Sequence, residues 1–276
     1  MNPGNMGRVW NRSFQGWGLA ACLGLVLLAG CASGPLGVGS AQTDLTTSSD
    51  ESEVRRRARI RLELAANYFQ LGKTEVALDE VKQSLAADPH YADAHNLRGL
   101  IYMALGDAAL AEDGFRRALA LQPRDGNVQH NYGWLQCQQQ RYAQADQLFT
   151  QALAQPQYLA KAKTWMAKGL CQQSAGELQE AQAALFKAYE MDAGNPVVAY
   201  NLANVLYVQG DVARAQFYIR RLNNSALANA ESLWLGIKVE RALGDQLAMA
   251  QLASPLGKRY PESREWLAYQ RGAFNE

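Results

Sequence analysis

The sequence has few of the residues from which active sites and cross-links are built. Its 276 residues include three histidines, four cysteines and eight prolines. The patterns His-Glu-x-x-His and Gly-x-Ser-x-Gly and the cysteine spacing of a zinc site do not occur, so the common metalloprotease, serine hydrolase and zinc motifs find no match. We therefore expect no enzymatic activity, no metal and no cofactor.

The chain also lacks an excess of charge of one sign. It has 27 Lys and Arg residues against 26 Asp and Glu residues, so no broad electrostatic surface for nucleic acid is present. No small-molecule substrate is indicated either. The one basic run, residues 55–61, is expected to be the solvated start of a helix that pairs with Asp50, Glu51, Glu53 and Glu63.

Two features that suggest chemistry are interpreted as structural. Residues 71–74, Leu-Gly-Lys-Thr, match the end of a phosphate-binding loop, but Asn67 stands where that motif needs glycine. Of the three histidines, His90, His95 and His130, the second falls at a helix-packing position. We expect none of them to bind a metal or to take part in catalysis.

Only one long apolar run occurs, at residues 16–30, and it follows Arg8 and Arg12. It is shorter than the ~20 residues of a membrane-spanning helix. Its end, Leu28-Ala29-Gly30-Cys31, resembles the lipobox of bacterial lipoproteins. We interpret residues 1–30 as a signal peptide, and the resemblance implies cleavage before Cys31 and lipid attachment to it. The alternatives are an ordinary signal peptide and an uncleaved anchor.

The residues after Cys31 indicate where the mature protein resides. By resemblance to sorted lipoproteins, Ala32 implies transfer to the outer membrane, with the protein on its periplasmic face. Residues 31–56 are rich in Gly, Ser and Thr and have scarcely any large apolar side chain. They are therefore expected to form a flexible, lipidated tether.

Residues 92–123 contain two amphipathic helical runs joined at Gly106 and closed by Pro123. Small residues, Gly99 in the first run and Ala111 in the second, stand where two helices must approach closely. This is the tetratricopeptide pattern, in which helical hairpins stack into a solenoid and bury their apolar faces against their neighbours.

The same positions recur along the chain. Consecutive hinges are spaced by 34, 34, 36, 34 and 34 residues. The period predicts an all-α, right-handed tetratricopeptide solenoid of six hairpins, with about twelve helices and a short C-terminal capping helix. The hinges are Gly72, Gly106, Gln140, Gly176, Gly210 and Gly244. The small positions of the first helices are Ala65, Gly99, Gly133, Gly169, Ala203 and Ile237.

The solenoid is assigned to residues 57–276. Its repeats are placed near residues 58–91, 92–125, 126–161, 162–195, 196–229 and 230–260. Asn195 is expected to cap a helix that begins at Pro196, and Pro261 to separate the capping helix from the last repeat. The large residue Ile237 is expected to make the last hairpin pack differently.

The first helix of each hairpin is expected to line the concave side of the solenoid. Counting from its small residue predicts the side chains that face a partner-binding groove. These are Asn96, Met103, His130, Trp134, Met166, Tyr200, Asn204 and Tyr207. Their aromatic members suit an extended or helical peptide. The alternative is that a tightly wound solenoid buries several of them.

Of the four cysteines, one lies in the expected signal peptide and Cys31 is the expected lipid site, which leaves Cys137 and Cys171. An oxidising compartment permits a disulfide. Bridging needs Cα atoms within ~7 Å, which is closer than most neighbouring helix axes. We therefore expect two buried free thiols.

Features beyond the generic repeat resemble one family. They are Asn131-Tyr132-Gly133, Gln140-Arg141-Tyr142, residues 233–238 and Arg259-Tyr260-Pro261-Glu262-Ser263. With the lipobox and six hairpins, they resemble the type IV pilus biogenesis lipoproteins of the PilF/PilW family. The resemblance implies a lipid-anchored outer-membrane pilotin that binds the secretin subunit and promotes its assembly. The alternatives are a scaffold for peptidoglycan enzymes or outer-membrane protein assembly, and an enzyme, which the sequence disfavours.

Overall fold

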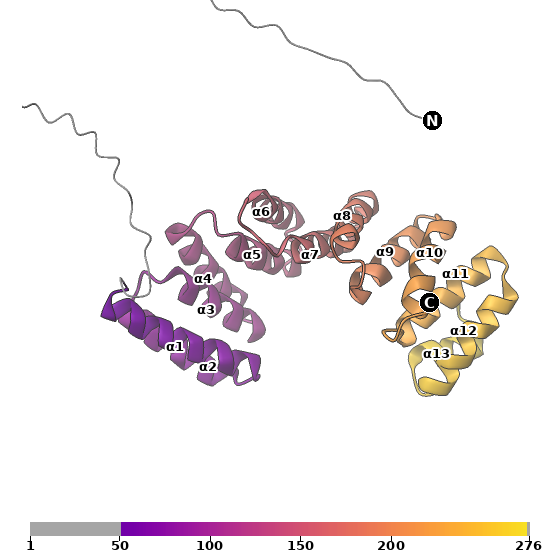
Figure 1. Ribbon diagram of the computed structural model, residues 1–276, viewed down its shortest axis with the longest axis horizontal. Helices are drawn as coiled ribbons and strands as arrows, with labels where there is room; N and C mark the ends of the chain where they lie inside the picture. The colour runs from indigo at the N-terminus through magenta and orange to yellow at the C-terminus, as the bar shows by residue number, and fades with distance from the viewer. Residues whose placement is uncertain (1–50, 275–276) are drawn as a thin grey trace, which may run out of the picture. The chain divides into compact units, whose positions relative to one another are not determined.

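The computed structural model describes residues 51–274, and every regular element in this range is an α-helix. Figure 1 shows these helices following one another as hairpins. The expected signal peptide, Cys31 and most of the expected tether lie outside the described residues. The helices are α1 (Glu53–Gln70), α2 (Thr74–Ala87), α3 (Ala92–Ala104), α4 (Ala108–Leu121), α5 (Gly126–Gln138), α6 (Tyr142–Ala154), α7 (Lys161–Ser174), α8 (Leu178–Met191), α9 (Pro196–Val208), α10 (Val212–Asn223), α11 (Ala230–Leu243), α12 (Gln246–Arg259) and α13 (Arg264–Arg271).

The all-α prediction of six hairpins and a capping helix is confirmed. Helices α1 to α12 pair in order as six hairpins, and α13 packs against α11 and α12. The first helix begins at Glu53, where the Ser52 hydroxyl accepts the Arg55 amide at 3.2 Å. Residues 53–56, which their composition assigns to the tether, therefore belong to α1. Within residues 51–274 no helix has the length and apolar character needed to span a membrane.

Each of the six hairpins turns at a residue with left-handed backbone geometry. Five of these residues are glycines, for example Gly106 with φ 80°. A glycine has no Cβ to clash at this helix end. The third hairpin uses Gln140, with φ 61°, at the expected position. The hinge positions derived from the period are thus confirmed, including the one that lacks glycine.

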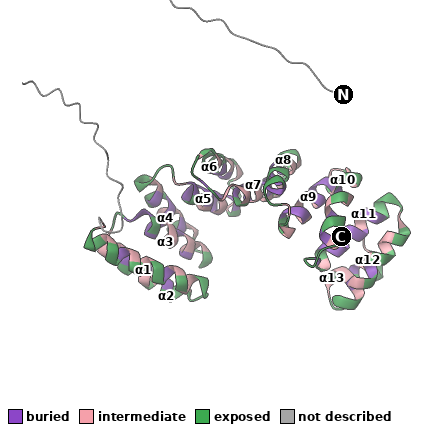
Figure 2. Ribbon diagram, in the orientation of Figure 1, coloured by how far each residue is buried: buried purple, intermediate pink, exposed green. Residues whose placement is uncertain are grey.

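In the first five hairpins, the small residue of the first helix lies against a larger residue of the second helix. A Cβ atom added at Gly99 would lie 2.6 Å from Cε1 of Phe115, and one added at Gly169 would lie 2.6 Å from Cγ of Leu185. Figure 2 shows buried residues on the facing sides of the hairpins. The second-helix residue that stands 16 positions after each small position is buried in every hairpin. These residues are Val81, Phe115, Phe149, Leu185, Ile219 and Ala253.

The last hairpin exchanges the two sizes. Ile237 stands at the small position of α11, and Ala253 stands at the large position of α12, in the same buried cluster. The expectation that Ile237 changes the packing of this hairpin is met by this exchange. A large residue on the first helix is accommodated because its counterpart on the second helix is small.

Short polar side chains cap the helices at several turns. The Asn195 side chain accepts the amides of Val197 and Val198, and α9 begins at Pro196 as predicted. Pro261 lies between α12 and α13, and Ser263 caps α13 by accepting the Trp266 amide at 3.1 Å. The sequence therefore placed both the start of the fifth repeat and the start of the capping helix.

The basic run at the start of α1 is neutralised by carboxylates. Glu51, Glu53 and Glu63 pair with it as predicted, and Asp50 lies outside the described residues. The ion pairs are Arg55–Asp88, Arg56–Glu53, Arg59–Glu51, Arg59–Glu63 and Arg61–Glu80. A run whose charges are already paired within the hairpin offers little attraction to a polyanion.

The hairpin contact can be tested in the second repeat. Gly99→Leu should lower the free energy of unfolding by ~1 to 3 kcal/mol because it overpacks the contact with Phe115. Adding Phe115→Ala should return part of that loss, since the pair then has the sizes of Ile237 and Ala253. Urea unfolding of both single variants and the double variant measures the coupling. Losses that simply add would contradict the contact.

Candidate functional site: the inner face of the first helices

The first helices of consecutive hairpins contact one another, whereas the second helices do not. In residues 51–274, α1 packs on α3, and this continues through α5, α7 and α9 to α11, but no contact joins α2 to α4 or any later pair of second helices. Helices on the inside of a bend lie closer together than those outside it. The surface formed by the first helices is therefore the inside of the bend and is called the inner face (Figure 1).

Seven of the eight residues predicted to line this face are half-buried. They are Asn96, Met103, Trp134, Met166, Tyr200, Asn204 and Tyr207. Trp134 packs beside the buried Phe149, and both tyrosines pack against the cluster that contains Leu206. The apolar members of this set pack against the core and keep part of their surface open, and their contact with a partner stays a prediction.

His130, the eighth residue, does not open to the inner face, and this corrects the prediction. Its side chain is 6% exposed. Its Nδ1 atom lies 2.9 Å from the Thr164 hydroxyl, which lies 2.6 Å from the hydroxyl of Tyr158. Burial, and then the charge of Lys163, lowers the pKa of His130 to about 4. The imidazole is a neutral part of the core between α5 and α7.

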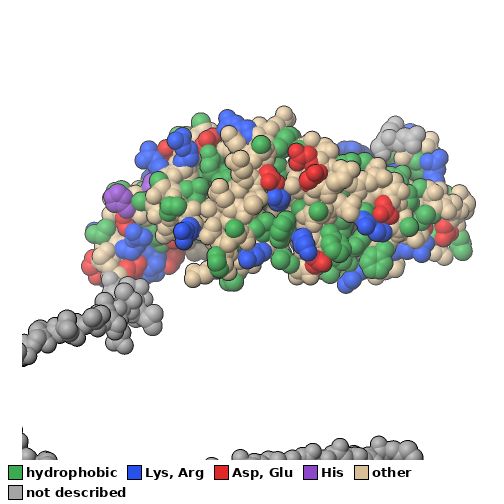
Figure 3. Space-filling view, turned by 90° about the horizontal axis from the view of Figure 1, so that it is seen from above, with side chains coloured by type: hydrophobic (Ala, Val, Ile, Leu, Met, Phe, Trp, Pro, Cys, Tyr) green, Lys and Arg blue, Asp and Glu red, His purple; other side chains and the backbone are tan. Residues whose placement is uncertain are grey.

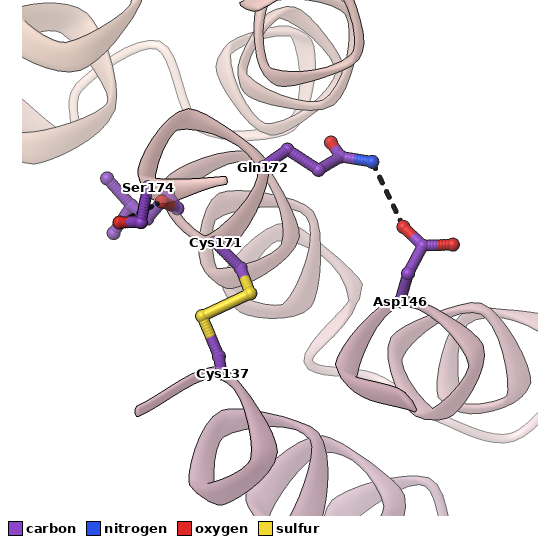
Figure 4. The surroundings of a disulfide bond; sticks show 6 residues. Cys137, Asp146, Cys171, Gln172 and Ser174 are labelled. Carbon is purple, nitrogen blue, oxygen red and sulfur yellow. Dashed lines mark hydrogen bonds between the residues drawn. A yellow bond between two sulfur atoms is a disulfide. The ribbon is translucent and has the colours of Figure 1, made fainter. Parts of the chain in front are cut away.

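Cys137 and Cys171 form a disulfide, so the prediction of two free thiols is wrong. The bridge joins α5 to α7, with the Cα atoms 5.7 Å apart (Figure 4). Neighbouring helix axes lie ~8 to 10 Å apart, but each Cα atom lies ~2.3 Å from its axis. Two Cα atoms that face each other therefore come within bridging range. The third and fourth repeats are linked covalently at the inner face.

Two residues of the Asn-Tyr-Gly element tie α5 to the repeat before it. Asn131 Nδ2 donates to Asn96 Oδ1 on α3 at 3.1 Å. The Tyr132 hydroxyl donates to Glu112 on α4 at 2.8 Å. Burial, and then the hydrogen bond to Glu112, raises the pKa of Tyr132 to about 12. This element therefore fixes how the second and third repeats meet.

The register of the inner face continues into the sixth repeat, where the sequence analysis did not follow it. Positions 34 residues after Tyr200 and Asn204 are Trp234 and Lys238. The Lys238 ammonium lies 5.9 Å from the centre of the Tyr207 ring and 5.8 Å from that of Trp234. The predicted groove residues ended in the fifth repeat and so omitted both residues. The same count of 34 would have found them.

The opposite side of the solenoid carries mixed charge. Figure 3, viewed from the side of α6 and α8, shows basic and acidic side chains interspersed with apolar ones. Phe186 on α8 and Phe217 on α10 are 40% and 61% exposed. Residues 71–74 lie at the turn between α1 and α2, outside any phosphate-loop setting. Among residues 51–274, no three His, Cys, Asp or Glu side chains are grouped to hold a metal.

Comparison with known families and proteins agrees with this architecture. Residues 62–126 and residues 173–233 each match a family described as tetratricopeptide repeat. The chain is 28% identical over 229 residues to the type IV pilus assembly protein PilF of Pseudomonas aeruginosa, a match that covers 83% of this chain and 90% of PilF. It is 30% identical over 135 residues to an uncharacterized Haemophilus influenzae protein, covering 49% of this chain and 75% of that protein.

Two solved structures are similar over their whole length. Pseudomonas aeruginosa pilF has a TM-score of 0.72 and 27% identity, and the match covers 80% of this chain and 100% of that structure. PilW, described as a widely conserved type IV pilus biogenesis factor, has a TM-score of 0.72 and 26% identity with the same coverage.

The neutral state of His130 predicts a pH dependence of stability. Between the usual value of ~6.5 and the folded pKa of about 4, only the unfolded chain binds a proton at His130, so stability falls as the pH falls through this window. From pH 7 to pH 5 the wild type should lose about 2 kcal/mol more than His130→Asn. Urea unfolding at both pH values measures this difference. Equal losses in the two proteins would contradict a neutral, buried imidazole.

Proposed function

Because the chain belongs to the PilF/PilW-like tetratricopeptide-repeat proteins, we propose that it acts in type IV pilus biogenesis as an outer-membrane lipoprotein that binds a secretin subunit and promotes secretin assembly. The observation that carries this proposal is the match to the whole of the PilF and PilW structures, at 27% and 26% identity. The match extends over all repeats of those proteins, so it is more than a shared repeat.

The inner face supplies the surface for this binding. Trp134, Tyr200 and Tyr207 are anchored in the core and keep part of their rings open. Aromatic side chains that are held in place lose little conformational freedom when a partner covers them, and such residues dominate the energetics of protein interfaces. A secretin segment that lies along the first helices would contact all three.

The proposed anchor is the lipid on Cys31. The sequence Leu28-Ala29-Gly30-Cys31 and the following Ala32 support a lipoprotein on the periplasmic face of the outer membrane. Two or three acyl chains give stable anchoring, at ~0.8 kcal/mol for each buried CH₂ group. A tether rich in Gly, Ser and Thr between the lipid and α1 would let the solenoid meet a partner at variable distances from the bilayer.

Truncating two of the aromatic side chains tests the binding surface. Trp134→Ala combined with Tyr207→Ala should weaken binding to the secretin by at least tenfold per residue, because hot-spot losses are ~2 kcal/mol or more. Secretin multimers and surface pili should be lost in cells, while the circular dichroism of the purified variant stays helical. Phe186→Ala combined with Phe217→Ala is the matched control on the second helices and should keep both multimers and pili.

Normal multimers in the inner-face variant, with loss in the control, would place the binding surface on the second helices. A wild-type chain that captures peptidoglycan enzymes or outer-membrane assembly proteins and no secretin would contradict the proposed function itself.

Loss of the lipid should separate folding from localisation. Cys31→Ser should leave the solenoid folded, since Cys31 precedes α1, but the protein should be missing from outer-membrane fractions because nothing anchors it. Fractionation and mass spectrometry of the N-terminal peptide measure the two effects. Wild-type amounts of the variant in the outer membrane would contradict lipidation at this residue.

A further inference from the structure

A cavity of about 390 Å³ lies between α11 and α13, at the end of the inner face. Its apolar lining includes Trp234 and Leu267, and its charged lining includes Lys238 and Arg264. Burial raises the pKa of Tyr200 on α9, and the nearby carboxylates of Glu231 and Glu265 raise it further. Tyr200 therefore lies near this cavity. The cavity thus continues the row of aromatic side chains on the inner face.

Lys238 is a half-buried cation without a carboxylate partner within residues 51–274. Its ammonium lies over the rings of Tyr207 and Trp234, at 5.9 and 5.8 Å. Burial lowers the pKa of Lys238, and no nearby acidic group opposes this effect. Taking a charge out of water costs free energy unless an opposite charge is supplied. Lys238 is thus placed to bind an anion that residues 51–274 do not provide.

The walls of the cavity are held in place before any ligand arrives. The Tyr260 hydroxyl donates to the Ala228 carbonyl at 3.0 Å, which fixes the end of α12 near the start of α11. On the other side of α13, Trp266 covers Gly257, where an added Cβ would lie 2.7 Å from the Trp266 ring. A preformed site loses less free energy to ordering when it binds.

The balance of charge around the cavity selects the ligand. The basic side chains Lys238 and Arg264 line it together with one acidic side chain, Glu265. A polyanion does not suit it, because the cationic site is small. A single carboxylate beside an apolar side chain would meet the ammonium of Lys238 and the exposed side chain of Leu267 together.

We propose that the cavity between α11 and α13 binds a carboxylate side chain of an acidic partner peptide, with Lys238 as the residue that recognises the charge. The peptide's neighbouring apolar side chain packs on the exposed Leu267. This inference rests on the proposed function, because the peptide is a segment of the same partner that lies along the inner face. It adds a charge requirement to a surface that otherwise selects by aromatic contact.

Two labelled peptides of equal shape test this proposal on the purified full chain. They are Gly-Phe-Asp-Leu-Gly and Gly-Phe-Asn-Leu-Gly, acetylated and amidated so that only one carries a carboxylate. Fluorescence anisotropy measures the dissociation constant of each peptide. The Asp peptide should bind at least about tenfold more tightly than the Asn peptide, because a charge-assisted contact forms in a partly buried site. Equal affinities would overturn the proposal.

Substitution of Lys238 tests whether its ammonium binds the carboxylate of the peptide. Lys238→Met keeps an unbranched apolar side chain and should reduce the ratio of the two affinities to about 1. Lys258→Met, at an exposed lysine of α12, is the matched control and should keep the ratio. The thermal midpoint of Lys238→Met should equal or exceed that of the wild type, because a poorly solvated charge is removed. An unchanged ratio in Lys238→Met would overturn the proposal.

The other occupants are outcomes of the same assay. Phosphatidylglycerol vesicles that displace the Asp peptide from the wild type, and fail to bind Lys238→Met, would assign the cavity to a lipid headgroup and overturn the proposal. A further probe is a peptide of residues 44–53 of this chain, which is acidic. If it bound more tightly than the Asp peptide, and if its binding also depended on Lys238, the occupant would be a second copy of this chain and the proposal would be overturned.

Capture of the secretin separates this proposal from the proposed function. If the wild-type chain binds no secretin but the Asp peptide keeps its advantage, the proposed function fails and the carboxylate site stands. If secretin is captured equally by the wild type and Lys238→Met, and the two peptides bind alike, the carboxylate site fails and the proposed function stands.

Discussion

The close contact inside each hairpin is the constraint on which the rest of the structure depends. A first helix with a small side chain approaches the second helix until a larger side chain fills the gap, as Phe115 does over Gly99. In the sixth hairpin the sizes are exchanged between Ile237 and Ala253, both of which stay buried. What recurs along the chain is therefore one small residue in each pair, on the first helix in five hairpins and on the second helix in the sixth.

The inner face follows from the way the hairpins stack. Each second helix packs on the first helix of the next repeat, and first helices also contact one another across repeats, whereas second helices of the described chain do not. The disulfide joins α5 to α7 on the inner face, and Asn131 bonds to Asn96 between α5 and α3. The side chains proposed to face a partner are the same ones that the stacking half-buries. Recognition and packing thus share residues, and a partner would meet a surface whose shape the core already determines.

The period of 34 residues was enough to predict the hinges and the close contacts within the hairpins, and the pair Asn195-Pro196 predicted the start of α9. The period failed where side chains reach across repeats. His130 bonds to Thr164 of the next repeat, and Thr164 bonds to Tyr158 in the longer connection between α6 and α7. A longer connection has no counterpart in the period. The disulfide was missed because axis spacing was used where the spacing of facing Cα atoms matters. Periodicity describes one hairpin well and contacts between hairpins less well.

The sixth repeat shows how a solenoid can end and still add a function. A terminal hairpin needs a cover for its open face, and α13 supplies it, with Trp234 stacked on Phe274 at 5.3 Å between ring centres. The position that is Asn204 in the fifth repeat is Lys238 in the sixth. A neutral amide there could have bonded within the protein, whereas the ammonium has no carboxylate partner in the described chain. A cation held at the closed end of an aromatic face gives a partner segment both an end point and a direction, which aromatic contacts alone do not provide.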